Sequence, residues 1–259
     1  MTVQRFQPAR QINCMDVVLE VIAFTHESAR IAQRSGAHRI ELCDNPGEGG
    51  TTPGYGMIKK VREDVAIQLY PIVRPRGGDF LYSPAEYEIM KRDIEMAREL
   101  LCDGVVIGIL TPEGEVDKER MKWLVELAYP MGVTFHRAFD RVKDPFQALE
   151  DLIELGCERI LTSGRKPTAI EGAFLLKQLI EQANDRIVVM PGSGVRSDNI
   201  LELAKQTGAI EFHSSARAEK PSAMQYVNPD MQENLKETIL NEAEVSKILQ
   251  LLKEYHPLA

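Results

Sequence analysis

Eight short apolar runs recur along the chain, and helix-like segments separate them. The runs occupy residues 18–24, 39–43, 68–74, 105–110, 133–139, 159–163, 187–191 and 210–214. They are strand-sized and rich in β-branched residues, which is typical of parallel strands buried on both faces. Strands that alternate with helices in this way form a parallel sheet covered by helices.

A glycine stands just before a strand at five of the expected helix ends. These glycines are Gly36, Gly104, Gly132, Gly156 and Gly208. We expect each to adopt the left-handed conformation that ends a helix, because glycine has no Cβ to oppose it. Eight such units in 259 residues favour a single (β/α)₈ barrel, known as a TIM barrel, over an open sheet. We expect residues 1–15 to be an extension and residues 16–259 to be the barrel, which a helix at 244–255 closes.

Composition restricts the partners and the compartment. The chain carries 31 basic and 39 acidic side chains, a net charge of −8, which argues against nucleic acid or a membrane surface as the main partner. No apolar run approaches the length of a membrane span. Four cysteines without a Cys-x-x-Cys pair fit reduced thiols, so we expect a cytoplasmic protein.

Charged residues interrupt the apolar runs where a barrel carries its active site, at the carboxyl ends of the strands. The candidate catalytic residues are Glu20, Glu41, Arg74, His136, Asp140 and His213. A buried strand does not carry a charge unless the charge is paired or faces a polar cavity. Two interpretations remain open: a functional pocket that contains carboxylates, an arginine and histidines, or a structural network of ion pairs.

Glycine-rich loops near these residues predict an anion site. Arg76 follows Arg74 in the third loop, and Gly192 and Gly194 follow the seventh run. Ser163, which ends the sixth run, is a further candidate. Backbone N–H groups in such loops and arginine side chains bind phosphate in many barrels, although the same glycines also suit an ordinary tight turn.

Metal-binding signals are few. Cys43 shares a strand face with Glu41, and it could meet His136 and His213 near the mouth of the barrel. Thiolate and imidazole ligands suit Cu(I) or Zn²⁺. We expect Cys14, Cys102 and Cys157 to be inert.

Several motifs resemble those of the CutC family. They are Arg-Ile-Glu-Leu-Cys at 39–43, Glu-Gly-Gly-Thr-Thr-Pro at 48–53, Arg-Pro-Arg-Gly-Gly-Asp-Phe at 74–80, Thr-Phe-His-Arg-Ala-Phe-Asp at 134–140, Arg-Ile-Leu-Thr-Ser-Gly at 159–164 and Gly-Ser-Gly-Val at 192–195. The resemblance implies a cytosolic (β/α)₈ barrel, a homo-oligomer (dimer or tetramer), and a role in copper homeostasis through Cu(I). It also implies that Cys43 is a copper ligand. Many relatives have a second cysteine in the first strand, where this chain has Ile22, so a two-cysteine site at these positions is not possible here.

Two functions from different classes therefore compete, and a third is simpler. The first is copper homeostasis through Cu(I) binding. The second is an enzyme of the hydrolase, lyase or isomerase type, whose acid–base groups act on a small anionic or phosphorylated substrate. The third is an interaction scaffold with an ion-paired interior. The expected partner is a copper ion or a small anion, without nucleic acid or membrane.

Overall fold

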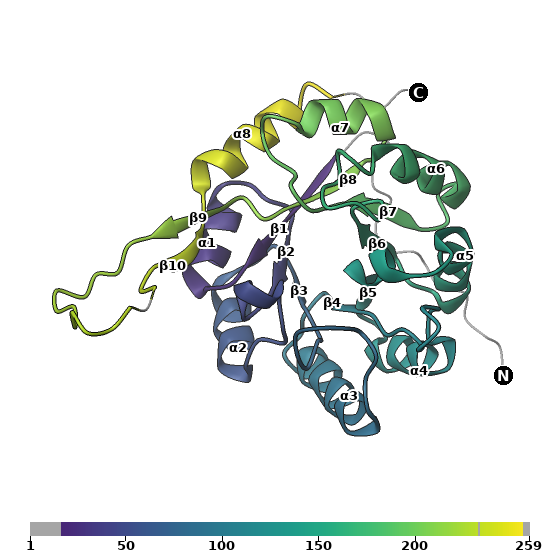
Figure 1. Ribbon diagram of the computed structural model, residues 1–259, viewed down its shortest axis with the longest axis horizontal. Helices are drawn as coiled ribbons and strands as arrows, with labels where there is room; N and C mark the ends of the chain where they lie inside the picture. The colour runs from purple at the N-terminus through teal and green to yellow at the C-terminus, as the bar shows by residue number, and fades with distance from the viewer. Residues whose placement is uncertain (1–16, 233, 256–259) are drawn as a thin grey trace.

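The computed structural model describes residues 17–232 and 234–255, and it is a (β/α)₈ barrel, as the sequence predicts (Figure 1). The strands of the barrel are β1 Val18–Ala23, β2 Arg39–Leu42, β3 Gln68–Pro71, β4 Gly104–Ile107, β5 Gly132–Phe135, β6 Arg159–Thr162, β7 Val188–Pro191 and β8 Glu211–Ser214. Each lies within or next to one of the eight apolar runs. The extension expected at residues 1–15, including Cys14, lies outside the described residues.

The strands run parallel in two four-stranded groups. Hydrogen bonds connect them in the orders β3-β2-β1-β8 and β4-β5-β6-β7. A parallel bridge between Ile72 and Val106 joins β3 to β4, and β7 lies beside β8, so the ring closes (Figure 1). In this register Glu20 of β1 is level with Arg39 of β2 on one side and with His213 of β8 on the other.

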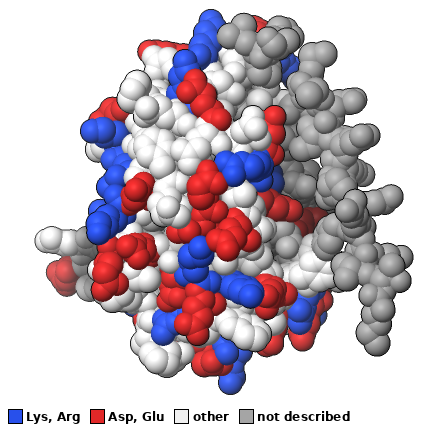
Figure 2. Space-filling model, turned by 90° about the vertical axis from the view of Figure 1, so that its right-hand side faces the viewer, with Lys and Arg blue, Asp and Glu red and all other residues white. Residues whose placement is uncertain are grey.

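Helices surround the ring of strands. They are α1 His26–Arg34, α2 Tyr55–Asp64, α3 Pro84–Glu99, α4 Lys118–Ala128, α5 Pro145–Leu155, α6 Ala173–Ala183, α7 Ile200–Thr207 and α8 Glu242–Leu252, with 3₁₀ turns η1 Pro46–Glu48 and η2 Arg137–Arg141. The last helix occupies most of the segment expected at 244–255. Figure 2 shows acidic and basic side chains interspersed on one outer face of the molecule. No helix in the described part of the chain is long and apolar enough to cross a membrane.

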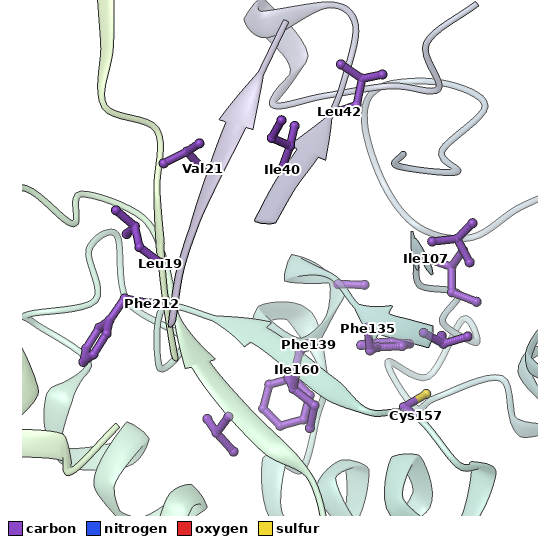
Figure 3. Close-up of a cluster of buried hydrophobic side chains, with 14 of the residues drawn as sticks. Leu19, Val21, Ile40, Leu42, Ile107, Phe135, Phe139, Cys157, Ile160 and Phe212 are labelled. Atoms are coloured by element: carbon purple, nitrogen blue, oxygen red, sulfur yellow. The ribbon is translucent and has the colours of Figure 1, made fainter. Parts of the chain in front are cut away.

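The main hydrophobic core lies between the strands and the helices. Leu19, Val21, Ile40, Leu42 and Phe212 point outward from their strands and are fully buried (Figure 3). Because strand side chains alternate between two faces, the residues between them point into the barrel. This alternation places Glu20, Glu41 and His213 inside, and their polar character needs a separate explanation.

Three of the five expected glycine caps are confirmed. Gly36, Gly156 and Gly208 have φ angles of 88°, 83° and 72°. The expectation was wrong for Gly104 and Gly132, which have no positive φ and instead begin β4 and β5. A Cβ at Gly104 would collide with the Tyr70 ring, and a Cβ at Gly132 would collide with the Glu158 carboxylate and the Tyr70 hydroxyl. These two positions need glycine for space and not for backbone conformation.

The fifth strand ends earlier than the sequence predicted. The expected run 133–139 stops at Phe135, and the chain then forms η2. Nδ1 of His136 accepts a hydrogen bond from the N–H of Ala138 at 3.2 Å, and so caps this turn. The turn carries Asp140 away from the strand end and toward the loop after β6.

A two-stranded antiparallel arm, described at residues 217–232 and 234–240, was not expected. It consists of β9 Arg217–Lys220 and β10 Glu237–Leu240, and it projects from the barrel beyond α1 (Figure 1). The N–H of Leu240 donates to Oγ of Ser28 at 3.1 Å, which fixes the base of the arm to α1. β9 is mostly polar and exposed, and β10 has only Ile239 and Leu240 as apolar residues, so neither strand carries an apolar run that the sequence could have shown.

Candidate functional site

A cavity of about 910 Å³ opens at the carboxyl ends of the strands. Ile22, Ile72 and Leu161 provide apolar lining, and polar side chains provide most of the rest. Of the predicted site residues, Glu41, Arg74, His136, Asp140, His213 and Gly194 line this cavity. The expected convergence at this end of the barrel thus brings together side chains from β2, β8, the loop after β3 and the turn η2 with its N-cap His136.

Beneath the cavity, two arginines and two glutamates form a buried network. Arg39 pairs with Glu20 through Nε and with Glu211 through Nη2. Nε of Arg159 lies 3.2 Å from the same oxygen of Glu211. All four side chains are almost completely buried. A charge in such a place is tolerated only when it is paired, so each member depends on the others.

Tyr70 packs against both arginines of this network. The Arg39 guanidinium lies 5.4 Å from the centre of its ring, and the Arg159 guanidinium lies 5.2 Å from it. The attraction between a cation and an aromatic face adds to the ion pairs. The hydroxyl of Tyr70 donates to Glu158 at 3.3 Å. The network is therefore held from below by an aromatic ring as well as by carboxylates.

Glu20 connects the network to the cavity through His213. Its Oε1 lies 2.8 Å from Nδ1 of His213, while its other oxygen is bonded to Arg39. On the other side of the ring, Nε2 of His213 lies 3.7 Å from Oε2 of Glu41, which is too long for a hydrogen bond. A carboxylate behind a histidine fixes the tautomer and orientation of the ring, both in metal sites and in general bases.

The two glutamates near His213 differ in protonation. Burial would raise the pKa of Glu20, but Arg39 and His213 outweigh it and lower the pKa to about 2. Burial raises the pKa of Glu41 to about 7, and the His213 charge only partly offsets this. For His213, burial acts to lower the pKa, yet the hydrogen bond to Glu20 and the charge of Glu41 raise it.

These shifts leave one proton to be shared. The positive charges of Arg39 and Arg159 balance the negative charges of Glu20 and Glu211. The Glu41 carboxylate and a neutral His213 ring together carry one negative charge, so one added proton makes this pair neutral. With that proton on Glu41 both groups are uncharged, and with it on His213 they form an ion pair. Because each form is neutral overall, moving the proton between the two groups leaves the net charge of the barrel interior unchanged.

His136 is buried on the opposite side of the cavity. Its Nδ1 accepts from the N–H of Ala138, and its Nε2 is buried with no hydrogen-bond partner. Burial and the nearby Arg74 charge lower the pKa of His136 to about 3. The ring is therefore neutral at physiological pH. Because Nδ1 is an acceptor, Nε2 carries the proton.

Arg74 is the buried cation of the cavity wall. Its guanidinium donates to the carbonyl oxygens of Glu48, Gly50 and Gly78 at 2.7, 2.8 and 2.8 Å. It thereby holds the loop after β2 against the loop after β3. Its Nε is buried and has no partner.

Asp140 and Ser163 hold the loop after β6. Asp140 accepts hydrogen bonds from Thr162 Oγ1 at 2.6 Å and from the N–H groups of Ser163 and Arg165 at 3.0 and 3.1 Å. Oγ of Ser163 bonds to Asp140 and to the carbonyl of Lys166. Both residues therefore already have protein partners, and only Asp140 borders the cavity.

The remaining anion candidates lie in different surroundings. Arg76 pairs with Glu86 and Asp79 and does not line the cavity. Gly192 is buried against Leu161 and His213, whereas Gly194 lines the cavity with a φ of 71°. These glycines and the arginine remain predictions as anion ligands.

Cys43 lies inside the barrel among apolar side chains. Its neighbours include Ile22, Ile72 and Val106. Burial, followed by the charge of Glu41, raises the pKa of the Cys43 thiol well above its usual range. Among the described residues, the group whose ligand atoms could hold a metal is Glu20, Glu41 and His213, within 4.8 Å of one another, and it does not include Cys43. Burial also raises the pKa values of Cys102 and Cys157 to about 12.

Sequence reasoning did not single out Arg39 and Arg159. Both stand at the first position of a strand, where a charge normally reaches solvent, and here both turn inward. Residues two apart share a strand face. Arg39 therefore points the same way as Glu41, and Arg159 the same way as Leu161, and this spacing was the signal that both arginines face the barrel interior. Arg141 and Arg217 were also missed as cavity residues, since η2 and β9 were not expected.

The fold and site define a (β/α)₈ barrel with a polar cavity at the carboxyl ends of its strands. The chain belongs to the CutC family, whose model matches residues 17–218. It is 55% identical to a family protein CutC of Chromobacterium violaceum over 82% of this chain and 86% of that protein. It is 50% identical to the human copper homeostasis protein cutC homolog over 82% of this chain and 77% of that protein. A solved structure of CutC from Streptococcus agalactiae has a TM-score of 0.74 and 35% identity, over 77% of this chain and 98% of that one.

We predict that Glu211→Gln destabilises the protein by about 3 kcal/mol, the usual cost of breaking a buried ion pair. The substitution removes the carboxylate that faces both Arg39 and Arg159. Urea denaturation at neutral pH measures the change in the free energy of unfolding. The matched control is Glu181→Gln on the exposed face of α6, for which we expect a change within about 0.5 kcal/mol. Equal effects of the two variants would contradict a structural role for the network.

We predict that Glu41 makes stability depend on pH in a specific direction. The folded protein holds the Glu41 proton up to a pKa of about 7, whereas the unfolded chain releases it near 4.5. The folded state therefore binds more protons between these values, and stability falls as the pH rises. The unfolding free energy of the wild type should therefore fall relative to that of Glu41→Gln as the pH rises from 4.5 to 7. A difference that stays constant over this range would show that burial does not raise the pKa of Glu41.

Proposed function

We propose that this protein takes part in copper homeostasis, the role that the names of its human and mouse relatives state. The support is the sequence relationship, which reaches 50% and 51% identity over 82% of this chain. It also covers 77% and 78% of the two relatives, so most of their length is represented. The structure adds which donor atoms could take up copper.

The donors favour the Glu41–His213 pair as the position for copper. Nε2 of His213 and Oε2 of Glu41 face each other at 3.7 Å beside the cavity. Metal bonds of about 2.0–2.2 Å to nitrogen and carboxylate oxygen can bridge such a separation. Nitrogen and oxygen ligands suit Cu(II), whereas Cu(I) prefers sulfur. The Glu20 carboxylate behind His213 provides the outer hydrogen bond that metal-bound histidines usually have.

Cys43 stays a prediction as a Cu(I) ligand, but its surroundings provide no second sulfur ligand and disfavour the thiolate. Ile22 occupies the place of a second cysteine, and the thiol must lose its proton in an apolar setting beside carboxylates. A thiolate gains stability from a nearby positive charge, which Arg74 supplies, but burial and the charges of Glu41 and Glu20 outweigh it. We therefore expect Cys43 to contribute less to copper binding than His213.

We predict that His213→Ala lowers the Cu(II) affinity at least tenfold, measured by competition with a chromogenic chelator. The matched control is His26→Ala, which removes a half-exposed histidine on α1. Under reducing conditions, the same competition with Cu(I) should be changed less by Cys43→Ser than by His213→Ala. The reverse order would establish Cys43 as the main ligand, and no effect of His213→Ala on either ion would reject the proposed position.

A second candidate is an acid–base enzyme, and the cavity is the observation that favours it. A volume of about 910 Å³ is in the range for a small organic molecule and far exceeds the need of one ion. Glu20 orients His213 as a general base would be oriented, and Glu41 holds a proton near neutral pH. Arg137, Arg141 and Arg217 line the cavity as well, which suits an anionic substrate.

We predict that the enzyme exchanges a carbon-bound proton of a small phosphorylated or carboxylated carbonyl compound with solvent. Incubation of a panel of such compounds in D₂O, followed by ¹H NMR, detects the exchange whatever product the reaction forms. His213→Asn should slow the exchange by at least about 10²-fold, a typical contribution of a general base. Retention of full activity by His213→Asn would exclude His213 as the base. Absence of exchange throughout the panel would count against this reaction class.

We also propose that the protein is a cytoplasmic homo-oligomer, a dimer or a tetramer, and that the arm contacts a second copy. The arm exposes Met224, Tyr226, Val227, Met231 and Leu235, each of which is 43–72% accessible. Apolar side chains on a projecting segment favour burial against a partner.

Replacing residues 221–236 by a short turn is predicted to give a monomer, as measured by light scattering with size-exclusion chromatography. The control is Trp123→Ser, which removes an exposed aromatic residue on α4 and should leave the assembly unchanged. Since the replaced segment projects away from the barrel, we expect the shortened chain to remain folded, which circular dichroism will show (Figure 1). An unchanged oligomer would exclude the arm as the contact.

A further inference from the structure

The charge of Arg74 lacks a carboxylate partner among the described residues. Arg74 is 6% exposed, and the bonds of its guanidinium run to three backbone carbonyls, which are neutral. Arg39 and Arg159, the other buried arginines, both pair with glutamate. A buried cation without a counter-ion is costly, and the unpartnered Nε adds an unsatisfied donor.

His136, which also lines the cavity, carries a second unsatisfied donor. The residue is 3% exposed, and its protonated Nε2 has no partner. The ring cannot easily turn away, because Gly108 lies against it so closely that a Cβ there would come within 2.6 Å of Nδ1. Nδ1 is committed to the N–H of Ala138. The imidazole is therefore fixed as a neutral donor.

One aromatic ring positions both donors. The Phe80 ring centre lies 4.9 Å from that of His136 and 5.1 Å from the Arg74 guanidinium. All three residues line the cavity. The acidic residues Glu48 and Asp79 also border it, but Asp79 pairs with Arg76, and the Glu48 carboxylate lies against Gly77. The Arg74 and His136 end of the cavity thus combines a guanidinium that has no carboxylate partner among the described residues with an imidazole whose Nε2 is unsatisfied.

We propose that Arg74 and His136 together bind an oxyanion of the cavity's ligand, a carboxylate or a phosphate group. Arg74 supplies the counter-charge and its Nε–H, and His136 donates from Nε2 as a neutral imidazole. His136 is then a binding residue that keeps its proton, in contrast to the acid–base role that its sequence position suggested. This inference rests on the second candidate function, since it names the chemical group by which that substrate would be held.

Binding of inorganic phosphate and of malonate, each measured by isothermal titration calorimetry, tests the inference with two sources of oxyanion. His136→Phe should weaken binding of the preferred anion about tenfold, the value of one hydrogen bond to a charged group. His136→Gln, whose amide can donate, should restore most of the loss. Arg74→Lys, which keeps the charge but not the Nε–H, should weaken binding. Arg98→Gln, which removes an arginine that bonds to Leu127 on the outer surface, is the control for net charge.

Long-range ¹H–¹⁵N NMR of the histidine side chains provides a readout that does not depend on the stability of variants. In the wild type, His136 should show a protonated Nε2 and an unprotonated Nδ1 from pH 5 to 8, and its Nε2 resonance should shift when the anion is added. The inference would be overturned if the His136 ring titrated between pH 5 and 8, or if its Nε2 resonance did not shift with either anion. Equal weakening by Arg98→Gln would reduce the effect to general electrostatics and would overturn it too.

The outcomes also separate this inference from the functions proposed above. Oxyanion binding that depends on His136, without proton exchange in any compound, would support the subsite and count against the enzyme. Proton exchange that depends on His213 but is indifferent to His136→Phe would support the enzyme and remove the subsite. Copper affinity is expected to be unchanged in His136→Phe, because His136 is not one of the residues whose ligand atoms lie close together with those of Glu41 and His213.

Discussion

The pairing of Arg39 and Arg159 with Glu20 and Glu211 is the constraint on which the rest of the barrel interior depends. Most small barrels fill this space with branched apolar side chains. Here the lower interior holds four charges, and their desolvation is repaid only because each carboxylate meets a guanidinium directly. Glycine at Gly104 and Gly132 follows from the same arrangement, since Tyr70, which lies against both arginines, and its hydrogen-bond partner Glu158 take up the space at these positions.

The network also determines the chemistry above it. Arg39 keeps Glu20 ionised, the ionised Glu20 holds Nδ1 of His213, and Nε2 is thereby directed toward Glu41. Glu41 has no arginine of its own, so burial dominates and its pKa rises. Glu20 and Glu41, on adjacent strands, thus differ in pKa because Arg39 pairs with Glu20 and not with Glu41. A paired carboxylate fixes geometry, and an unpaired one remains free to exchange a proton or accept a metal.

The sequence predicted the barrel well because its signals were local. Apolar runs, glycines at helix ends and the position of charges at strand ends depend on a few neighbouring residues, and the eight strands lie close to where those signals place them. The arm was not predicted because a polar strand such as Arg217–Lys220 shows no alternation of apolar and polar residues. At the site, the convergence of Glu41, His136 and His213 followed from their strand positions. The sequence could not show which charges cancel. It marked Arg74 as a site candidate and passed over Arg39, and only the fold shows that Arg39 pairs with glutamate while Arg74 donates to carbonyl groups.

The two ends of the cavity complement each other electrostatically. The Glu41–His213 end is neutral with one shared proton, and a divalent ion that replaced this proton would add one net positive charge to the interior. The Arg74–His136 end carries a further positive charge without a carboxylate partner in the described structure. Both excess charges would be offset by a ligand that brings negative oxygens into the space between them, because charges interact more strongly in a partly buried site than in bulk water. A metal at one end and an oxyanion at the other would therefore stabilise each other, so the copper-related and the enzymatic interpretations of this cavity are compatible and not exclusive.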